Sequence, residues 1–388
     1  MTKQKRRFLL LAAVYLSFIT LGMPDGALGV AWPGIRYEMN LPLGHGQFIF
    51  MTHAFVYALI GSLSGRIAER ISLGPMNGIG LLLMVAALFG FALSPNFIVF
   101  VGMAALLGTG MGLIDSSLNS FMAKYFSSRH MNLLHCFWGL GGAISPIIMS
   151  QLILLSSWRT GYVSIALVQT IVAGLVLVTL LRGVWQMDGE QTNEQRLNGQ
   201  SERPFLTKKR FQYIQMLIFF LYTGTEYSVT FWTTSVLLES RGMDIAIAGL
   251  YPAVYLGSIM GGRILFGYLA NRLSNTAMIR LGFLLAMVGG LTLIVSSHII
   301  GIALLGLGFA PIFPCLMHET SKRFSPAILT KLVGYQIAAV GTGIAIVSAV
   351  VGQILSRVSL EALFPLVALL IVVCFLLNEL IEKNMAKN

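Results

Sequence analysis

Two stretches decide the fold, Gly65-Arg-Ile-Ala-Glu-Arg-Ile-Ser72 and Gly267-Tyr-Leu-Ala-Asn-Arg-Leu-Ser274, which lie 202 residues apart. Each follows an apolar run that is long enough to cross a lipid bilayer. A second match keeps nearly the same spacing, because Leu107-Gly-Thr-Gly110 returns 198 residues later as Leu305-Gly-Leu-Gly308. The two halves of the chain therefore share the same landmarks in the same order.

A third match lies in the first apolar run of each half. Asp25 and Trp32 fall opposite Glu226 and Trp232, within one residue of the same register. Three matches in register predict an internal duplication of the chain.

The composition predicts that lipid surrounds this protein. Hydrophobic residues make up 56% of the chain and charged residues only 11%, whereas soluble proteins carry roughly 25% charged residues. The net charge of +11 reflects how the chain is oriented in the membrane, since 22 of the 26 Lys and Arg residues belong to the loops on one side. The exceptions are Arg36, Arg159, Arg241 and Arg357. We therefore expect the bilayer, and no nucleic acid, as the partner of the basic residues.

Twelve segments have the length and apolarity of membrane spans. They lie near residues 8–33, 44–68, 76–94, 97–123, 131–156, 159–182, 211–238, 245–269, 275–296, 299–321, 330–356 and 361–382. An even number of spans in each half gives both halves the same orientation, which predicts a parallel repeat about an axis along the membrane normal. We expect an all-α membrane protein of two six-helix bundles.

One connection is long. Residues 183–210 are rich in charged residues, Gln, Asn and Ser and have no apolar face, so we expect a polar linker between bundles at 1–182 and 211–388. The basic residues near the linker and the termini place all of them in the cytoplasm by the positive-inside rule. The predicted location is a bacterial cytoplasmic (inner) membrane, which the chain crosses many times, as a monomer.

Nothing in the sequence indicates an enzyme or a cofactor. Cys136, Cys315 and Cys374 are isolated in apolar runs, and neither they nor the histidines have the spacing of metal ligands. The chain lacks the Gly-x-x-x-x-Gly-Lys loop that binds nucleotide phosphates, which argues against transport driven by ATP.

The chain resembles the major facilitator superfamily over essentially its whole length. The strongest match is the stretch from Gly65 to Ser72, which is similar to the superfamily's Gly-x-Leu-Ala-Asp-Arg-x-Gly loop between spans two and three. The resemblance implies a gating role for Gly65, Glu69 and Arg70, and for Arg272 in the second copy. Glu69 replaces the usual Asp, and the second copy has Asn271 at that position.

Within the superfamily, the chain looks most like the fucose/glucose permease group of sugar:proton symporters. The residues that carry this resemblance are Gly22-Met-Pro-Asp25-Gly26, Asp115, and the run Asn132-Leu-Leu-His135 with Gly139, Gly141-Gly-Ala143 and Pro146 after it. That group places one acidic residue in span one and another in span four, near the sugar path. The resemblance implies the same for Asp25 and Asp115, although the fucose permease has Glu rather than Asp in span four.

Three carboxylates lie well inside predicted spans, Asp25, Asp115 and Glu226. A carboxylate in the bilayer is costly, and it marks a functional site unless an ion pair or an interhelical hydrogen bond accounts for it. A carboxyl group held near neutrality by apolar surroundings can take up and release protons. We therefore predict that these three residues couple solute movement to protons.

Two of these acids have informative neighbours. Asn119 lies four residues after Asp115, so both share a helix face that is expected to line the solute path. Asp25 follows Pro24 and has Gly22 and Gly26 close by, so the first helix is expected to be kinked or locally unwound there. Broken helices of this kind often surround transporter binding sites.

The remaining substrate-binding candidates are polar or aromatic residues within spans. They are His135, Trp138, Tyr227, Trp232 and Gln336. An aromatic ring can pack on the apolar face of a sugar, and an amide or imidazole can hydrogen-bond its hydroxyl groups. The competing interpretation is that the aromatics belong to the core or the interface belt and that the polar groups join helices.

Together these features predict a proton-coupled secondary transporter of a small polar solute, a sugar being favoured, that works by alternating access. Two alternatives stay open at this point. A proton-driven exporter of drugs or amphipathic metabolites would use an apolar cavity, for which 19 Met and 24 Phe are available. A non-transporting sensor would need a signalling domain, and the longest polar stretch is only the linker of about 28 residues.

Overall fold

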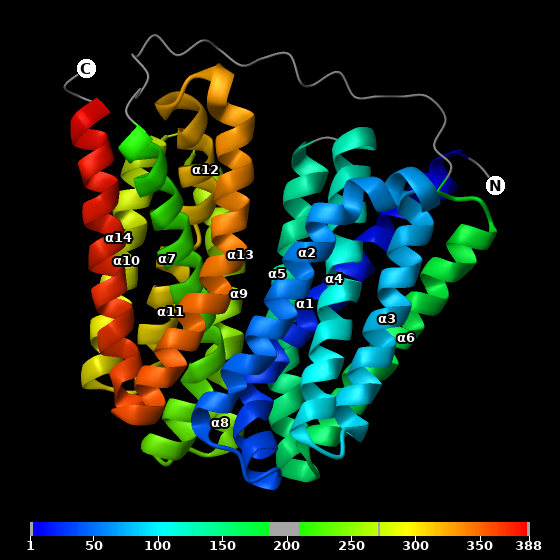
Figure 1. The fold of residues 1–388 in the computed structure, drawn as a ribbon, viewed down its shortest axis with the longest axis horizontal. Helices are drawn as coiled ribbons and strands as arrows, with labels where there is room; N and C mark the ends of the chain where they lie inside the picture. The colour runs from blue at the N-terminus through cyan, green and yellow to red at the C-terminus, as the bar shows by residue number, and fades with distance from the viewer. Residues whose placement is uncertain (1–2, 127, 186–208, 271, 386–388) are drawn as a thin grey trace. The chain divides into compact units, whose positions relative to one another are not determined.

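The computed structural model describes residues 3–126, 128–185, 209–270 and 272–385 (Figure 1). These residues form helices and turns, with no β-strand among them. The α-helices of the first half are α1 (Lys3–Glu38), α2 (Gly46–Ile71), α3 (Leu73–Leu93), α4 (Phe97–Tyr125), α5 (Ser128–Leu155) and α6 (Trp158–Leu181). Those of the second half are α7 (Lys209–Ser235), α8 (Ile245–Ala248), α9 (Leu250–Leu269), α10 (Asn275–Val295), α11 (Ile299–Phe309), α12 (Ile312–Arg323), α13 (Pro326–Arg357) and α14 (Leu363–Met385).

The chain divides into two compact units. Unit 1 comprises Met1–Leu41 and Phe48–Asn198, and unit 2 comprises Pro42–Gln47 and Gly199–Asn388. The expected linker at 183–210 falls largely on residues 186–208, which lie outside the described residues. Pro42–Gln47, which includes the short 3-10 helix η1 (Leu43–His45) and the first two residues of α2, belongs to unit 2 although the rest of α2 belongs to unit 1.

Twelve membrane spans account for the helices. Eleven helical segments of the described chain are long and apolar enough to cross a membrane. The twelfth is α7, whose 27 residues suffice in length but include Glu226 and several threonines. The predicted all-α fold of two six-helix bundles is confirmed.

Three spans are less regular than the sequence predicted. Span seven ends in a π-helical turn, Val236–Ser240, and span eight is divided at Gly249 into α8 and α9. Span ten, predicted near 299–321, is found at Ile299–Thr320, where a short turn at Ala310 and Pro311 separates α11 from α12. Proline has no N–H and its ring displaces the preceding turn, which accounts for the break.

The first helix shows the opposite behaviour. Although Pro24 and Pro33 lie inside it, α1 is helical without interruption from Lys3 to Glu38. The local unwinding expected near Pro24 is therefore wrong. The neighbouring glycines have another role, since they bring α1 against α5.

Backbone contacts at glycines repeat between the two units. A Cβ atom on Gly141 of α5 would lie 1.8 Å from the Ile19 carbonyl oxygen of α1. A Cβ atom on Gly343 of α13 would lie 2.1 Å from the Phe220 carbonyl oxygen of α7. Small residues allow helix backbones to approach closely in membranes. Since Gly343 lies 202 residues after Gly141, the duplication seen in the sequence extends to helix packing.

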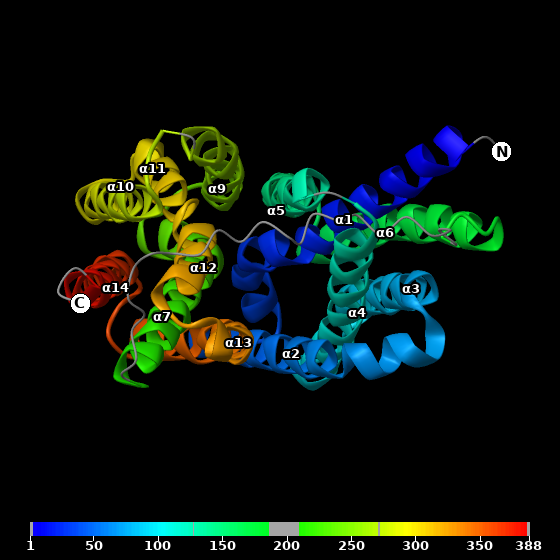
Figure 2. The same cartoon turned by 90° about the horizontal axis from the view of Figure 1, so that it is seen from above.

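The same helix pairs form in each unit. In unit 1, α1 packs on α5, and α3 packs on α4 and α6. In unit 2, α7 packs on α13, and α10 packs on α11 and α14. Figure 2 shows these pairs side by side within each unit. The positions are equivalent, because the first, third, fourth, fifth and sixth spans of each half make the same contacts.

One end of each unit is held by an arginine with a glutamate. In unit 1, Arg159 at the start of α6 binds Glu38 at the end of α1, with 2.8 Å between Nη2 and Oε1, and donates to the Ala92 and Ser94 carbonyl oxygens. In unit 2 the arginine and the glutamate have exchanged positions. Arg241 follows the seventh span and Glu361 precedes the twelfth, with 2.7 Å between Nη2 and Oε2. Arg159 and Arg241, two of the four basic residues that lie outside the main set of basic loops, thus join helix ends.

The opposite end of unit 2 holds a buried ionic network around Arg323. This side chain is 1% exposed and donates hydrogen bonds to Gln215 of α7 (2.7 Å), Asn378 of α14 (2.8 Å) and Glu382 of α14 (2.6 Å). Thr320 accepts from Gln336 of α13 at 3.1 Å and from Gln215 at 3.4 Å. The network therefore joins α7, α12, α13 and α14.

Candidate functional site

Asp25 lies in the middle of α1 and is 7% exposed. The Trp138 side chain of α5 donates a hydrogen bond to its carboxylate. The close approach of α5 explains this contact, because a Cβ atom on Gly22 would lie 2.1 Å from the Trp138 carbonyl oxygen. Two residues that the sequence assigned to different roles, coupling and solute binding, are thus brought together.

Asp115 of α4 uses both of its carboxylate oxygens. Asn119 donates from Nδ2 to Oδ1 at 2.8 Å, as their spacing of one helical turn predicts. The Tyr57 hydroxyl of α2 donates to Oδ2 at 2.7 Å. Tyr57 was not among the residues that the sequence pointed to, because a partner on another helix has no signature in the spacing along one helix.

A small cavity separates Asp25 from α2. It is lined by Asp25 and His53 together with apolar side chains such as Leu28, Phe50 and Leu107. The space has room for at most one water molecule. A sugar does not fit here in this conformation, but a bridging water does.

The charges around these two acids decide how they can behave. Of the ion pairs in the described part of the chain, none involves Asp25 or Asp115. Their hydrogen-bond partners are the neutral side chains of Trp138, Tyr57 and Asn119. A tyrosine hydroxyl both donates and accepts, so its bond to Asp115 can persist with reversed direction when the carboxyl group is protonated.

Glu226 of α7 has different surroundings in unit 2. It is 7% exposed and lies near the Tyr222 hydroxyl one turn earlier, which donates its proton to the Phe309 carbonyl oxygen at 3.0 Å. Arg263 of α9 is close enough to interact electrostatically with it. The Tyr255 hydroxyl also donates to the Glu226 carbonyl oxygen at 3.3 Å. Because it interacts with a positive charge, as Asp115 does not, Glu226 is a weaker candidate for proton exchange than Asp115.

Two of the predicted solute ligands have packing contacts. Trp232 is fully buried, with its ring 2.5 Å from the Cβ position of Gly352, and its indole N–H meets no acceptor among the described residues. Gln336 is fully buried and hydrogen-bonds Thr320 in the Arg323 network. Both positions hold helices of unit 2 together.

The other two predicted ligands are accessible. His135 of α5 is exposed, and its ring meets the edge of Phe18 with 5.7 Å between centroids. Tyr227 of α7 is half-buried, beside Glu226 in the chain. Both remain candidates for solute contact.

The expected gating residues lie mostly on a helix rather than a loop. Gly65, Glu69 and Arg70 belong to the last two turns of α2, which ends at Ile71, so the connection to α3 is short. Glu69 and Arg70 are exposed. Arg272 is exposed between α9 and α10, with its guanidinium carbon 5.8 Å from the centre of the Tyr268 ring.

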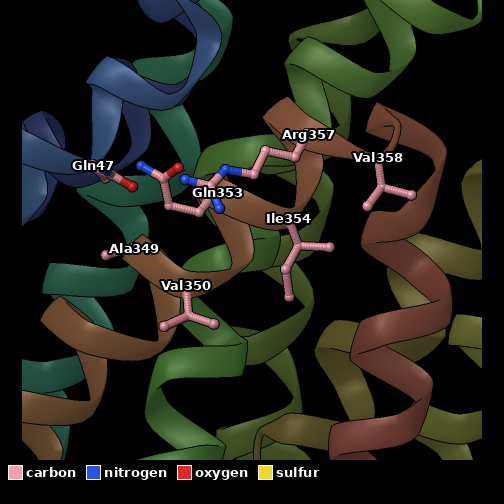
Figure 3. Close-up of a pocket in the computed structure, with 7 residues that line it drawn as sticks. All are labelled: Gln47, Ala349, Val350, Gln353, Ile354, Arg357 and Val358. Carbon is pink, nitrogen blue, oxygen red and sulfur yellow. The ribbon is translucent and has the colours of Figure 1, made fainter.

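A second pocket lies in unit 2, at the last turns of α13 (Figure 3). Its volume is about 310 Å³. Figure 3 shows Gln353 and Arg357 of α13 extending toward Gln47, while apolar residues such as Val350 and Ile354 complete the lining. No carboxylate lines it, so it offers no proton-exchanging group comparable to Asp115.

Metal chemistry finds no support in the described residues. No group of three or more His, Cys, Asp or Glu side chains within them is placed to hold a metal ion.

The sequence is similar to those of known membrane transporters. The model of the Major Facilitator Superfamily matches residues 14–335. The probable sulfoacetate transporter SauU of Cupriavidus necator is 25% identical over 303 residues, covering 71% of this chain and 68% of that protein. The glucose/mannose transporter GlcP of Bacillus subtilis is 24% identical over 366 residues, covering 88% and 87%.

Solved structures agree on the fold. A bacterial homolog of the human lysosomal transporter Spinster, in an inward-facing and occupied conformation, has a TM-score of 0.76 at 14% identity, covering 99% of this chain and 98% of that one. At this identity the likeness shows the fold alone. With twelve helices in two repeated six-helix bundles and a family match over most of its length, the chain belongs to the Major Facilitator Superfamily and is a membrane transporter.

Proposed function

We propose that this transporter is a proton-coupled symporter of a small polar solute, with a sugar as the favoured class. The observation that supports it best is the Asp115 cluster, in which Tyr57 and Asn119 bind both carboxylate oxygens and no ion pair among the described residues involves the acid. A carboxyl group held by neutral partners can alternate between its two protonation states without breaking an ion pair.

Asp25 is the second proton-exchanging group in this proposal. Trp138 holds its carboxylate, and the same indole offers an apolar face for a sugar ring when the site opens. His135 on α5 and Tyr227 on α7 are further solute ligands. Glu226, which interacts electrostatically with Arg263, has a supporting role.

The sugar class rests on two supports. The asparagine and tryptophan side chains that hold the acids are of the kind that recognise hydroxyl groups and sugar rings. A relative with nearly full-length coverage is named a glucose/mannose transporter. The proposal further places the chain as a monomer in a bacterial inner membrane, with both termini in the cytoplasm and Gly65, Glu69, Arg70 and Arg272 acting in gating.

Transport into proteoliposomes tests this proposal. Purified protein is reconstituted, a pH gradient acid outside is imposed, and accumulation of labelled glucose, mannose and fucose is followed. Accumulation that disappears when a protonophore collapses the gradient supports symport. Uptake that is indifferent to the gradient contradicts it, and gradient-driven extrusion of an amphipathic dye, without sugar uptake, supports an exporter instead.

A further inference from the structure

Two residues of α2 lie between the acids of the proposed site. His53 and Tyr57 are one helical turn apart on α2, and Met111 and Asp115 are one turn apart on α4. The helices α2 and α4 are in contact at both of these turns. His53 Nε2 lies 3.1 Å from Met111 Sδ, and the Tyr57 hydroxyl lies 2.7 Å from Asp115 Oδ2.

Glycines of α4 make this close contact possible. A Cβ atom on Gly108 would lie 2.5 Å from the His53 carbonyl oxygen, and one on Gly112 would lie 3.0 Å from that of Tyr57. Side chains at these positions would force α2 away from α4. The pairing of His53 and Tyr57 with α4 is therefore fixed by the backbone and not by flexible side chains alone.

His53 also faces the other acid. It lines the same small cavity as Asp25, and the centres of the His53 and Tyr57 rings are 6.3 Å apart. The polar groups therefore follow one another in the order Asp25, cavity, His53, Tyr57 and Asp115. Three helices, α1, α2 and α4, contribute to this series, and all belong to unit 1.

We propose that His53 and Tyr57 form a proton path between Asp25 and Asp115. This inference rests on the proposed proton coupling and assigns a route to it. The titratable groups of this path are Asp25 on α1, His53 and Tyr57 on α2, and Asp115 on α4. Neither His53 nor Tyr57 needs to touch the solute.

The transfer balances in protons. Protonated Asp25 releases its proton to a ring nitrogen of His53, directly or through one water in the cavity, which leaves a carboxylate and an imidazolium. The imidazolium then releases a proton to the Tyr57 oxygen while the Tyr57 hydroxyl proton passes to Asp115 Oδ2. His53 and Tyr57 end neutral, Asp25 ends ionised and Asp115 ends protonated.

Imidazole suits this position for a physical reason. It can accept a proton at one ring nitrogen and release one from the other. The thioether of Met111 is only a weak hydrogen-bond acceptor, so it orients the ring without holding an imidazolium as a carboxylate would.

Two substitutions remove the path and leave the acids intact. His53→Asn removes the titratable ring, and Tyr57→Phe removes one hydroxyl group. Matched controls are His298→Asn, at the exposed N-cap of α11 where Asn also caps well, and Tyr213→Phe, at an exposed position of α7. Labelled glucose is the probe solute, with mannose and fucose in parallel.

The experiment compares two kinds of flux in proteoliposomes. Exchange of internal for external glucose without a gradient requires the solute site and the conformational change but no net proton movement. We expect His53→Asn and Tyr57→Phe to retain this exchange within about two-fold, while accumulation driven by the pH gradient falls about 10²-fold, the scale of a lost proton-transfer group. The two controls are expected to behave as the unaltered protein.

The outcomes separate the two proposals. Gradient-driven accumulation in His53→Asn that equals that of the unaltered protein overturns the proton path but leaves symport standing. Equal loss of exchange and accumulation in both variants assigns the residues to packing and also overturns the path. Absence of gradient-driven accumulation of all three sugars in the unaltered protein contradicts the proposed function itself.

Discussion

Arg323 offers the clearest test of how unit 2 is held together. The substitution Arg323→Leu places a shorter, apolar side chain in the helix and removes three hydrogen bonds of 2.6 to 2.8 Å. Glu382 loses its cation and keeps the Thr276 hydroxyl at 3.2 Å. An acid is thereby left in a poorly solvated site, with 17% of its side chain exposed.

The expected magnitude follows from burial. Removing one partner of a buried ion pair costs roughly 3–5 kcal/mol. Because Glu382 retains some contact with solvent, we expect the lower end, about 3 kcal/mol. For a unit of this size, each kcal/mol lowers the midpoint of thermal unfolding by roughly 2–4 °C. The expected decrease is therefore about 6–12 °C.

Thermal unfolding of the purified protein in detergent, followed by tryptophan fluorescence at one fixed heating rate, measures this decrease. The matched control is Arg280→Leu, which breaks the Arg280–Glu379 pair on the same unit. Both of those side chains are partly exposed, at 52% and 29%, so we expect a loss of no more than about 1 kcal/mol. The double variant Arg323→Leu with Glu382→Leu is expected to recover much of the stability, because it leaves no unpaired charge. Equal midpoints for Arg323→Leu and Arg280→Leu would refute the reasoning.

Two further predictions concern the helix contacts. Gly141→Ala places a methyl group where only 1.8 Å separates it from the Ile19 carbonyl oxygen, so we expect a loss of roughly 1–3 kcal/mol, while Gly174→Ala, with nothing within 4 Å, leaves the unfolding midpoint unchanged or higher. Similar midpoints for the two variants would contradict the packing argument. Arg159→Lys is expected to lower the midpoint nearly as much as Arg159→Gln, because an ammonium group cannot bind Glu38 and two carbonyl oxygens in the same fork. Full stability of the Lys variant would show that charge alone suffices there.

Much of the fold could be predicted from the sequence because lipid imposes strict rules. Helix length, apolarity and the repeated landmarks led to twelve spans in two related bundles. Local backbone behaviour was less predictable. Pro24 leaves α1 helical whereas Pro311 ends α11, and the two cases differ in packing that the spacing of residues does not reveal.

The candidate site, like the fold, could be predicted from the sequence only in part. The pairing of Asp115 with Asn119 follows from the spacing along one helix. The hydrogen bond of Tyr57 to Asp115 and the electrostatic interaction of Arg263 with Glu226 join different helices, and a single sequence holds no signal for them. An arginine inside the apolar run of α9 was the available hint for Arg263, and it was counted with the loop residues instead.

The central claim is that Asp115 exchanges the coupled proton. The most direct measurement is the pH change when glucose is added to proteoliposomes that hold no gradient, recorded with an external pH dye for Asp115→Asn. Asp244→Asn is the matched control, since Asp244 is an exposed helix cap that Asn replaces well. The account predicts that the external medium becomes more alkaline for the unaltered protein and for Asp244→Asn, and that Asp115→Asn abolishes this change while glucose exchange persists. Alkalinisation of normal size in Asp115→Asn would contradict it.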